Sequence, residues 1–451
     1  MSSSGIEKQK NKEMTGAVFS LLISLSIPTI LEEVLSTLIQ YVDTAMVGNL
    51  GEKATAAVST TTTINWLIHS VPAAIYVALL ALAARAMGAG DEKRLKKLSG
   101  QAILLALLSG AFIEVIALVL SPFIPVWMGV EEDIVKPAAE YFFILSTTLL
   151  FRTSARIFAA MIRATKDTKT PMMISVAENI LNVGLNYVFI YVLDLGVKGA
   201  AIASAISYFI GGMAMYIVFR CNKYLRCELS QIKPDRDILR ECTKIGLPAL
   251  MTHCASCLGY VVFAGTVSGM GTRVFAAHSI AVTAEEIVYI PGYGLRTATS
   301  TLVGNALGEK NDEKLRITEE LSIIITMIIM IVNGVLLYIF AYPLMQLFTS
   351  SDSVALLGSQ MLRLVAFSEP FFGLMIVLEG IFYGMGRTKD VFIVETFSMW
   401  CIRILSTIIC VKVFELPLIA VWICMIADNV SKALLLLAVH IKNKRVRLHI
   451  N

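Results

Sequence analysis

The chain has 451 residues, of which 56% are apolar and 16% are charged, and its mean hydropathy is +0.73. Soluble domains average roughly 45–50% apolar and about 25% charged residues, so this composition excludes an ordinary soluble protein. The formal net charge is only +4 and the eight cysteines are scattered, so neither a nucleic-acid partner nor a disulfide framework is expected.

Twelve stretches of the chain are long and apolar enough to cross a membrane, for which about 20 mainly apolar residues suffice. In chain order the predicted spans cover residues 16–49, 55–86, 99–127, 134–162, 171–193, 199–219, 239–270, 274–305, 318–348, 354–385, 391–413 and 417–440. Prolines inside four of them predict kinks, since each removes a backbone donor: Pro28, Pro72, Pro248 and Pro291. The predicted fold class is an all-α membrane protein.

The chain also repeats itself at a fixed offset, such that the numbers of matching residues differ by 220. The matching pairs are Pro28 and Pro248, Gly51 and Gly271, Gly88 and Gly308, Leu95 and Leu315, Thr168 and Thr388, and Ala200 and Ala420, so no gap is expected between the copies. Self-similarity at a fixed spacing indicates two copies of one structural unit. Because each copy holds six spans, an even number, both enter the membrane in the same direction. This predicts two pseudo-symmetric six-helix bundles related as a parallel repeat.

Lysine and arginine gather in the connections that follow the even-numbered spans. These connections lie at 85–97, 163–169, 310–316 and 387–389, together with the middle linker and the C-terminal tail. Basic connections face the cytoplasm, which predicts a multi-pass protein of the plasma membrane with both termini inside. The predicted division is an N-lobe at 1–218, a cytoplasmic linker at 219–238 and a C-lobe at 239–451.

Several motifs resemble those of the multidrug and toxic compound extrusion (MATE) transporters. The sequence Val42-Asp43-Thr44-Ala45-Met46-Val47-Gly48 resembles the signature of their first helix, and Pro291-Gly292-Tyr293-Gly294 resembles their eighth. The loop Arg163-Ala164-Thr165-Lys166-Asp167-Thr168-Lys169 is similar to their connection between the fourth and fifth helices. The seventh span lacks the acidic residue that is seen in the NorM-like branch, so the resemblance is closer to the DinF-like bacterial branch than to the NorM-like branch.

The resemblance implies a secondary active antiporter that works by alternating access. It would export small organic, cationic compounds in exchange for H⁺ or Na⁺, with no cofactor besides that coupling ion. The runner-up is a flippase for lipid-linked oligosaccharide or a related lipid precursor, a function found on the same fold. An enzyme is not expected, because no metalloprotease, nucleophile-elbow or phosphate-loop motif occurs. The expected partners are small-molecule substrates and the lipid bilayer, and the expected state is a monomer.

Four polar residues interrupt the first apolar span: Glu32, Glu33, Gln40 and Asp43. Ionisable groups inside spans are costly, so they usually face an interior cavity or a partner. Glu32 and Asp43 are eleven residues apart, about three turns, and therefore share one face. The resemblance makes Asp43 a coupling-ion or proton residue, and Glu32 and Glu33 are further candidates. The alternative for either glutamate is a structural contact with the backbone or a hydroxyl.

A stripe of asparagines follows one face of the fifth span, at Asn179, Asn182 and Asn186. Asn182 and Asn186 are candidates to share the coupling ion, while Asn179 and Gln40 are candidates to bind substrate. Structural hydrogen bonds between helices are the alternative. The DinF-like branch implies a second carboxylate about where Asn186 stands, so an aspartate pair cannot be assumed here.

Acidic residues also occur in the later spans. Glu285 and Glu286 in the eighth span and Glu379 in the tenth are candidates to bind a cationic substrate. Glu285, His278 and Arg296 lie near one face of the eighth span, so a buried network of Glu285 with Arg296 or His278 is the alternative. We expect the charges inside the spans to be mostly acidic, with little compensation beyond these two residues.

Overall fold

The computed structural model describes residues 3–450, and every regular element in that range is a helix. Contacts divide the chain into an N-half unit, residues 31–250 and 307–310, and a C-half unit, which comprises the other described residues. Two long helices, α1 (Ser3–Gly48) and α10 (Arg236–Ser268), are divided between the units. The two units are defined by contacts between residues, whereas the predicted lobes are defined by the sequence repeat. The contact units therefore do not test the lobe boundaries, which stay a prediction.

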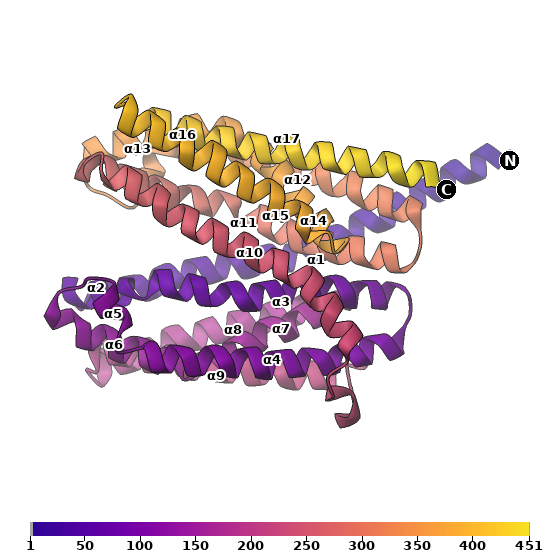
Figure 1. Ribbon diagram of the computed structural model, residues 1–451, viewed down its shortest axis with the longest axis horizontal. Coiled ribbons are helices and arrows are strands. Elements are labelled where there is room, and N and C mark those ends of the chain that lie inside the picture. Colours follow the sequence, from indigo (N-terminus) through magenta and orange to yellow (C-terminus); the bar gives the residue numbers. More distant parts are fainter. Residues whose placement is uncertain (1–2, 451) are drawn as a thin grey trace. The chain divides into compact units, whose positions relative to one another are not determined.

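The N-half unit is a bundle arranged around one central helix. Besides parts of α1 and α10 it holds α2 (Glu52–Thr60), α3 (Thr62–Gly88), α4 (Glu92–Leu120), α5 (Ile124–Trp127), α6 (Glu132–Ser146), α7 (Leu149–Ala164), α8 (Lys169–Asn186), η1 (Tyr187–Val192), α9 (Gly196–Cys221) and η2 (Leu229–Ile232). Contacts join α7 to α3, α4 and α9, and Figure 1 shows these helices running side by side. Side chains of α7 therefore have neighbours on several helices.

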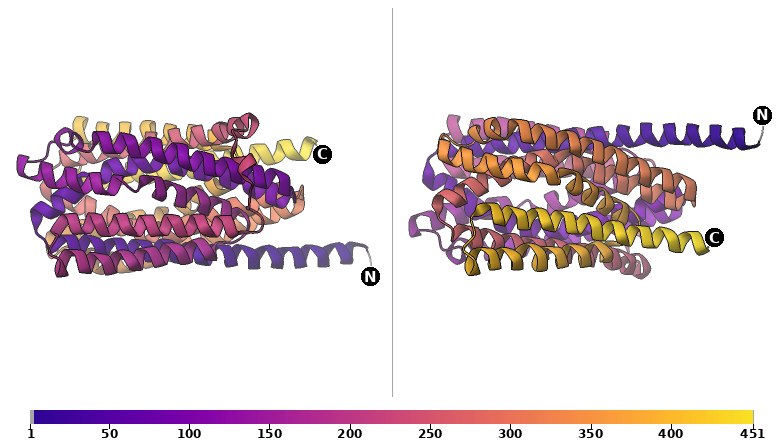
Figure 2. Two further views of the ribbon diagram at one scale, coloured as in Figure 1. Left: turned by 90° about the horizontal axis from the view of Figure 1, so that it is seen from below. Right: turned by 90° about the horizontal axis from the view of Figure 1, so that it is seen from above.

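The C-half unit holds the start of α1, the end of α10 and the remaining helices. These are α11 (Thr272–Gly308, except its last two residues), α12 (Asp312–Gln346), α13 (Asp352–Val365), η3 (Ala366–Ser368), α14 (Glu369–Gly384), α15 (Thr388–Phe397), η4 (Ser398–Ile404), α16 (Leu405–Ile408), η5 (Ile409–Val413) and α17 (Leu418–Ile450). The start of α1 and the end of α17 extend from the same end of this unit (Figure 2). This placement agrees with an even number of spans.

The twelve-helix membrane fold in two repeats is confirmed. Ten helices of the described residues are long and apolar enough to cross a membrane, and the bent pair α6–α7 makes an eleventh. The twelfth is α11, which has 37 residues but carries Glu285, Glu286 and Arg296 among its apolar positions. Charged residues lower the mean hydropathy of a helix, and this explains why α11 has the weakest membrane signal of the twelve.

The repeat is visible in the backbone conformation and not only in the sequence. Positive φ angles recur at Gly51 and Gly271, Gly90 and Lys310, and Lys166 and Gly386, all at the offset of 220, and then at Asp194 and Glu415, at an offset of 221. The second copy therefore has one extra residue between 386 and 415, and the expectation of no gap was wrong. Ala200 corresponds to Val421 rather than to Ala420. The π-helix η4 lies in this interval, and its wider turn accommodates one added residue.

Two predicted spans are broken at equivalent places. The fourth span, predicted as one helix over 134–162, bends by 47° between α6 and α7, and the tenth, predicted over 354–385, is interrupted by η3. A helix that restarts inside a span has N–H groups without intrahelical partners. In the N-half unit, Glu114 of α4 accepts a hydrogen bond of 2.9 Å from the N–H of Leu150. A carboxylate on a neighbouring helix thus stabilises the new start.

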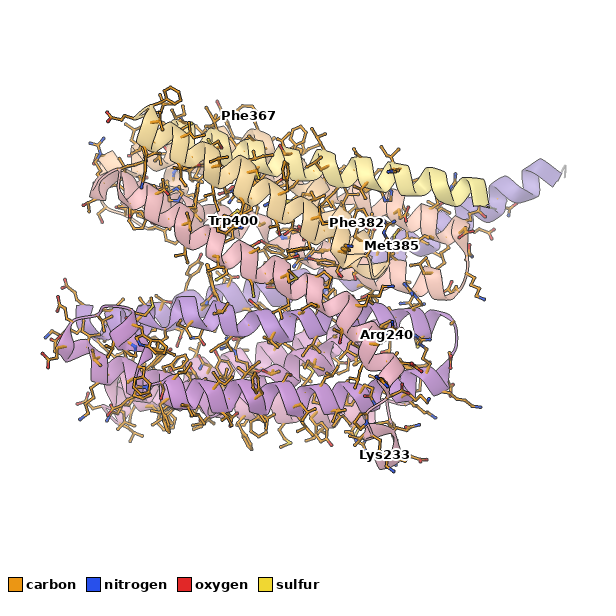
Figure 3. All side chains as sticks on the ribbon, viewed as in Figure 1. Lys233, Arg240, Phe367, Phe382, Met385 and Trp400 are labelled. Carbon is orange, nitrogen blue, oxygen red and sulfur yellow. The ribbon has the colours of Figure 1, made fainter. Side chains whose placement is uncertain are left out.

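The connections predicted to be cytoplasmic meet one another in the N-half unit. Arg94 pairs with Glu241 at 2.6 Å, and Lys97 pairs with Asp235 at 3.3 Å. The linker packs on α4, where Gln101 Nε2 donates a hydrogen bond of 2.7 Å to the carbonyl of Lys233. Figure 3 shows Lys233 and Arg240 at this end of the unit. These two basic connections of the N-half unit therefore lie together, which agrees with the positive-inside prediction for that unit.

Accessibility labelling tests which side this is. Cys221 is exposed at the end of α9, next to the linker, and Asn49 is exposed in the first connection. In a variant that keeps only Cys221, we expect a membrane-impermeant thiol reagent to label the protein in broken cells but not in intact cells. A variant with cysteine only at Asn49→Cys should be labelled in intact cells. The opposite pattern would reverse the orientation.

Candidate functional site

Asp43 of α1 meets the asparagine stripe of α8 in the N-half unit. Asn186 Nδ2 donates hydrogen bonds to Asp43 Oδ1 and, over 3.2 Å, to Asn182 Oδ1. Asn182 Nδ2 donates in turn to Ser204 Oγ of α9 over 3.0 Å. A continuous series of hydrogen bonds therefore joins α1, α8 and α9 and begins at a carboxylate.

The asparagine stripe also contacts α1 about two turns away from Asp43. Asn179 Nδ2 donates a hydrogen bond of 3.1 Å to Ser36 Oγ of α1. Gln40, a candidate substrate residue between Ser36 and Asp43, is exposed. Asn179 is thus engaged within the N-half unit, whereas the side chain of Gln40 remains accessible to a ligand.

Glu32 takes part in a different contact, an ion pair inside the N-half unit. Arg163 Nη2 of α7 lies 2.6 Å from Glu32 Oε2, and the two side chains are 12% and 15% exposed. Arg163 Nη1 also donates to the hydroxyl of Tyr76 on α3 over 3.1 Å. This geometry agrees with the structural interpretation of Glu32, with an arginine as the partner in place of backbone or hydroxyl. Arg163 was counted among the basic residues of a cytoplasmic connection, but its charge is paired with that of Glu32.

The same three residue types recur in the C-half unit with two positions exchanged. At the offset of the repeat, Arg296 of α11 is the counterpart of Tyr76, and Tyr383 of α14 is the counterpart of Arg163. Arg296 Nη1 lies 2.8 Å from Glu379 Oε2, and Tyr383 lies within electrostatic range of the guanidinium. We call each arginine–tyrosine–glutamate set a clamp. The arginine and the tyrosine stand at equivalent positions, whereas the glutamate comes from α1 in one half and from α14 in the other. Glu379 is engaged by Arg296 within the C-half clamp.

Glu285 and Glu286 have different surroundings although they are adjacent. Glu285 is 2% exposed and accepts a hydrogen bond from the hydroxyl of Tyr289, one turn further along α11. The hypothesis that Glu285 pairs with Arg296 or His278 was wrong, because Arg296 pairs with the clamp glutamate and His278 packs edge-on against aromatic rings. Glu286 is exposed, since adjacent helical residues point about 100° apart.

Basic residues inside the spans are more numerous than expected. Ionisable residues that were not singled out in the sequence include Glu114, Arg152, Arg156 and Glu178 in the N-half unit and Glu395, Arg403, Asp428 and Lys432 in the C-half unit. Each lies inside a predicted apolar span, and that position alone was a usable signal. Acidic residues are still the majority, but the expectation of little compensation beyond His278 and Arg296 was wrong. Arg156 is exposed at mid-span, and Glu33, also exposed, lies within electrostatic range of it.

The donor atoms around Asp43 suit a hard cation or a proton. Among residues 3–450, no group of three or more His, Cys, Asp or Glu side chains is placed to hold a metal ion. The oxygens available near Asp43 come from Asn182, Asn186 and Ser204, and Asn186 Oδ1 is buried with no hydrogen-bond donor in the described part of the chain. Carboxylate and amide oxygens bind hard cations, and the carboxylate alone can take a proton.

A model of the MatE family matches two segments of the chain, residues 28–188 and 248–409. The starts of the two matched segments differ by 220 and their ends by 221, which agrees with the one-residue insertion in the second copy. The "Probable multidrug resistance protein NorM" of Thermotoga maritima is 28% identical over 96% of this chain and 94% of its own length. The "Probable multidrug resistance protein YoeA" of Bacillus subtilis is 24% identical over 93% and 92%.

Solved structures share the fold over nearly the whole chain. The MATE transporter VcmN of Vibrio cholerae matches with a TM-score of 0.90 at 19% identity, covering 96% of this chain and 98% of that one. A transporter of the MOP superfamily from Pyrococcus furiosus matches with a TM-score of 0.88 at 24% identity, covering 95% and 97%. At these identities the likeness concerns the fold alone. The branch within the family stays a prediction.

The N-half clamp generates a stability prediction. Removing one partner of a buried ion pair leaves an uncompensated charge, so Arg163→Gln should lower the free energy of unfolding in mixed micelles by about 3 kcal/mol. The double variant Glu32→Gln/Arg163→Gln should recover part of that loss, because neither charge is then left alone. Lys169→Gln, at an exposed position on the start of α8, is the control and should change little. Strictly additive losses in the double variant would contradict the clamp.

Proposed function

This chain belongs to the MATE family, and we propose that it is a secondary antiporter that exports small organic cations in exchange for H⁺ or Na⁺. The observation that carries the proposal is the contact of Asp43 with the polar face of α8. Asp43, Asn186 and Asn182 form a connected group that one proton or one Na⁺ can reorganise. The bilayer is the medium in which this exchange takes place.

The hydrogen-bond chemistry gives the ion a way to change the structure. An ionised Asp43 only accepts hydrogen bonds, so it holds Asn186 with its amide NH₂ turned toward α1. A protonated Asp43 donates, and its natural acceptor is then Asn186 Oδ1, which requires the amide to turn over. A bound Na⁺ attracts the same oxygen. Turning the amide removes the donor from Asn182 and so weakens the series of bonds that joins α1, α8 and α9.

Coupling then follows from a difference in preference between two conformations. Ion and substrate need not touch the same residue, because each needs only to bind one state better than the other. In this scheme the ion stabilises the state in which the amide of Asn186 is turned over, and the substrate stabilises the state in which Asp43 is ionised. The proposed coupling residues are Asp43, Asn182 and Asn186. Glu32 is instead the structural partner of Arg163 in the clamp.

Exposure ranks the candidates for substrate binding. Glu286 and Gln40 are exposed, so they are free to approach a ligand. Glu285 and Glu379 are held by Tyr289 and Arg296, and a substrate would have to displace those partners. We therefore propose Glu286 as the principal anionic contact for a cationic substrate.

A second function is favoured by one observation. Arg152 and Arg156 lie one turn apart on α7, and a flippase for lipid-linked precursors would use such guanidinium groups to hold phosphates. Glu33 lies close to Arg156 and offsets part of this positive charge. We therefore rank the flippase second. Preferential transport of an anionic lipid by reconstituted wild-type protein, with no export of cationic dyes, would reverse this order.

Asp43→Asn tests the coupling proposal. Asparagine has the size of aspartate and can still accept the hydrogen bond from Asn186. It does not take up a proton near neutral pH and carries no negative charge to bind Na⁺. We expect ion-driven export from proteoliposomes to be abolished while the protein stays folded. Asp194→Asn is the matched control, because Asp194 is an exposed aspartate with φ of 50°, a conformation that asparagine adopts readily. Undiminished export by Asp43→Asn at equal expression would remove Asp43 from the mechanism.

Glu286→Gln tests the charge preference for substrate. Loss of an exposed anion should weaken resistance of an efflux-deficient host to cationic dyes more than resistance to neutral compounds, since only the former lose an ionic contact. Glu415→Gln, in an exposed connection, provides the comparison. An equal loss for both classes of compound would indicate that Glu286 serves the fold and not the substrate.

A further inference from the structure

The repeat allows the ion site of the N half to be located in the C half. At the offset of 220, Asp43 corresponds to Phe263 of α10, and Gln40 corresponds to Tyr260. After the insertion in η4 the offset is 221, so Arg403 stands in the place of Asn182 and Thr407 in the place of Asn186. The C-half counterpart therefore has Phe263 in place of the carboxylate and contains an arginine in η4.

The guanidinium of Arg403 lies against the corresponding face of α10. Its Cζ is 5.7 Å from the ring centroid of Tyr260 and 5.7 Å from that of Phe263. These are the counterparts of Gln40 and Asp43. Attraction between a guanidinium and two aromatic faces is stronger away from water, and Arg403 is 4% exposed. In the C half, a cation thus occupies the position where the N half presents an acid.

Arg403 is fixed in place by α17. Its Nε lies 2.8 Å from Asp428 Oδ2, and its Nη2 donates a hydrogen bond of 3.2 Å to Asn429 Oδ1. Asp428 is fully buried and also pairs with Lys432, whose Nζ is 3.0 Å away. A buried carboxylate needs such partners. The side chain of Arg403 reaches this position from the π-helix η4, the element that the first copy of the repeat lacks.

We propose that Arg403 is a tethered cation that permanently fills the C-half counterpart of the Asp43 site. A guanidinium neither loses its proton in proteins nor dissociates, unlike H⁺ or Na⁺ at Asp43. The C half therefore takes no coupling ion at this place, and the exchangeable ion passes through the N half alone. The statement about the exchangeable ion rests on the proposed function, whereas the occupancy by Arg403 does not.

The competing explanation is a purely structural ion pair of Arg403 with Asp428. Both explanations predict that Arg403→Ala destabilises the protein. Only a site shaped for a cation predicts that a free guanidinium ion, at concentrations far below those that denature proteins, will enter the vacated space and restore stability. Entry requires Asp428, so Arg403→Ala/Asp428→Asn should not respond.

The experiment measures the midpoint of thermal unfolding of the full-length purified protein with guanidinium chloride or, at equal ionic strength, choline chloride. We expect guanidinium to raise the midpoint of Arg403→Ala saturably, and to leave wild type and Arg403→Lys unchanged because their sites are filled. If Arg403→Ala does not accumulate, the readout is the yield of folded protein from cells grown with and without guanidinium. Absence of any rescue by guanidinium in both readouts would overturn the proposal, as would an Arg403→Lys variant as unstable as Arg403→Ala.

The ion claim is tested separately in the Asp43→Asn variant. In that variant, any dependence of the unfolding midpoint on Na⁺ concentration or pH should be unchanged when Asp428→Asn is added. Arg403 and Lys432 already pair with Asp428, so no ion is needed there. A dependence that Asp428→Asn removes would mean that the C half binds an ion at this place and would overturn the proposal. If wild type exports nothing, the proposed function fails, but guanidinium rescue still reports whether Arg403 fills a cation site.

Discussion

An ionised side chain inside an apolar helix needs a partner, because the bilayer offers neither water nor counterions to replace one. Besides the neutral contacts of Glu114 and Glu285, three arrangements meet that requirement in this protein. A clamp in each half pairs an arginine with a glutamate, Arg403 and Lys432 enclose Asp428, and Asp43 depends on the amide of Asn186. Only the last of these uses a neutral partner. An ion that neutralises Asp43 therefore changes a contact that no fixed positive charge of the chain maintains.

The two clamps show how a duplicated chain can keep a contact while exchanging the residues that make it. Tyr76 and Arg163 lie on α3 and α7, whereas Arg296 and Tyr383 lie on the corresponding helices in the opposite order. The glutamate also changes place, from Glu32 on α1 to Glu379 on α14, so the contact of arginine with glutamate forms from different helices in the two halves. This favours a structural role for Glu32 and Glu379, although both are acids inside spans.

The sequence predicts the twelve spans and the repeat, because these depend on hydropathy and spacing along the chain, whereas the contact of Asp43 with Asn186 depends on how α1 and α8 pack. It does not predict the insertion in η4, since one added residue leaves an apolar stretch apolar and only the backbone angles at Asp194 and Glu415 reveal the change of spacing. Nor does it predict the partner of Arg296. Glu285 and Glu379 are both acids inside spans, and which of them pairs with Arg296 depends on how α11 and α14 pack. The overlooked Arg403 and Asp428 were visible as charges inside spans, but their meaning required the corrected spacing.

The asymmetry between the halves has a consequence for where a coupling ion can act. A symmetric pair of ion sites would allow an ion to favour the same rearrangement in both halves. Here one half holds a carboxylate that can be neutralised, and its counterpart holds Arg403, whose charge is constant. Under the proposed function, the free energy that an ion contributes is applied at α1, α8 and α9, while Arg403 in η4 keeps its charge. A substrate cation at Glu286 would then compete with the ion through a difference in preferred state and not through a shared residue.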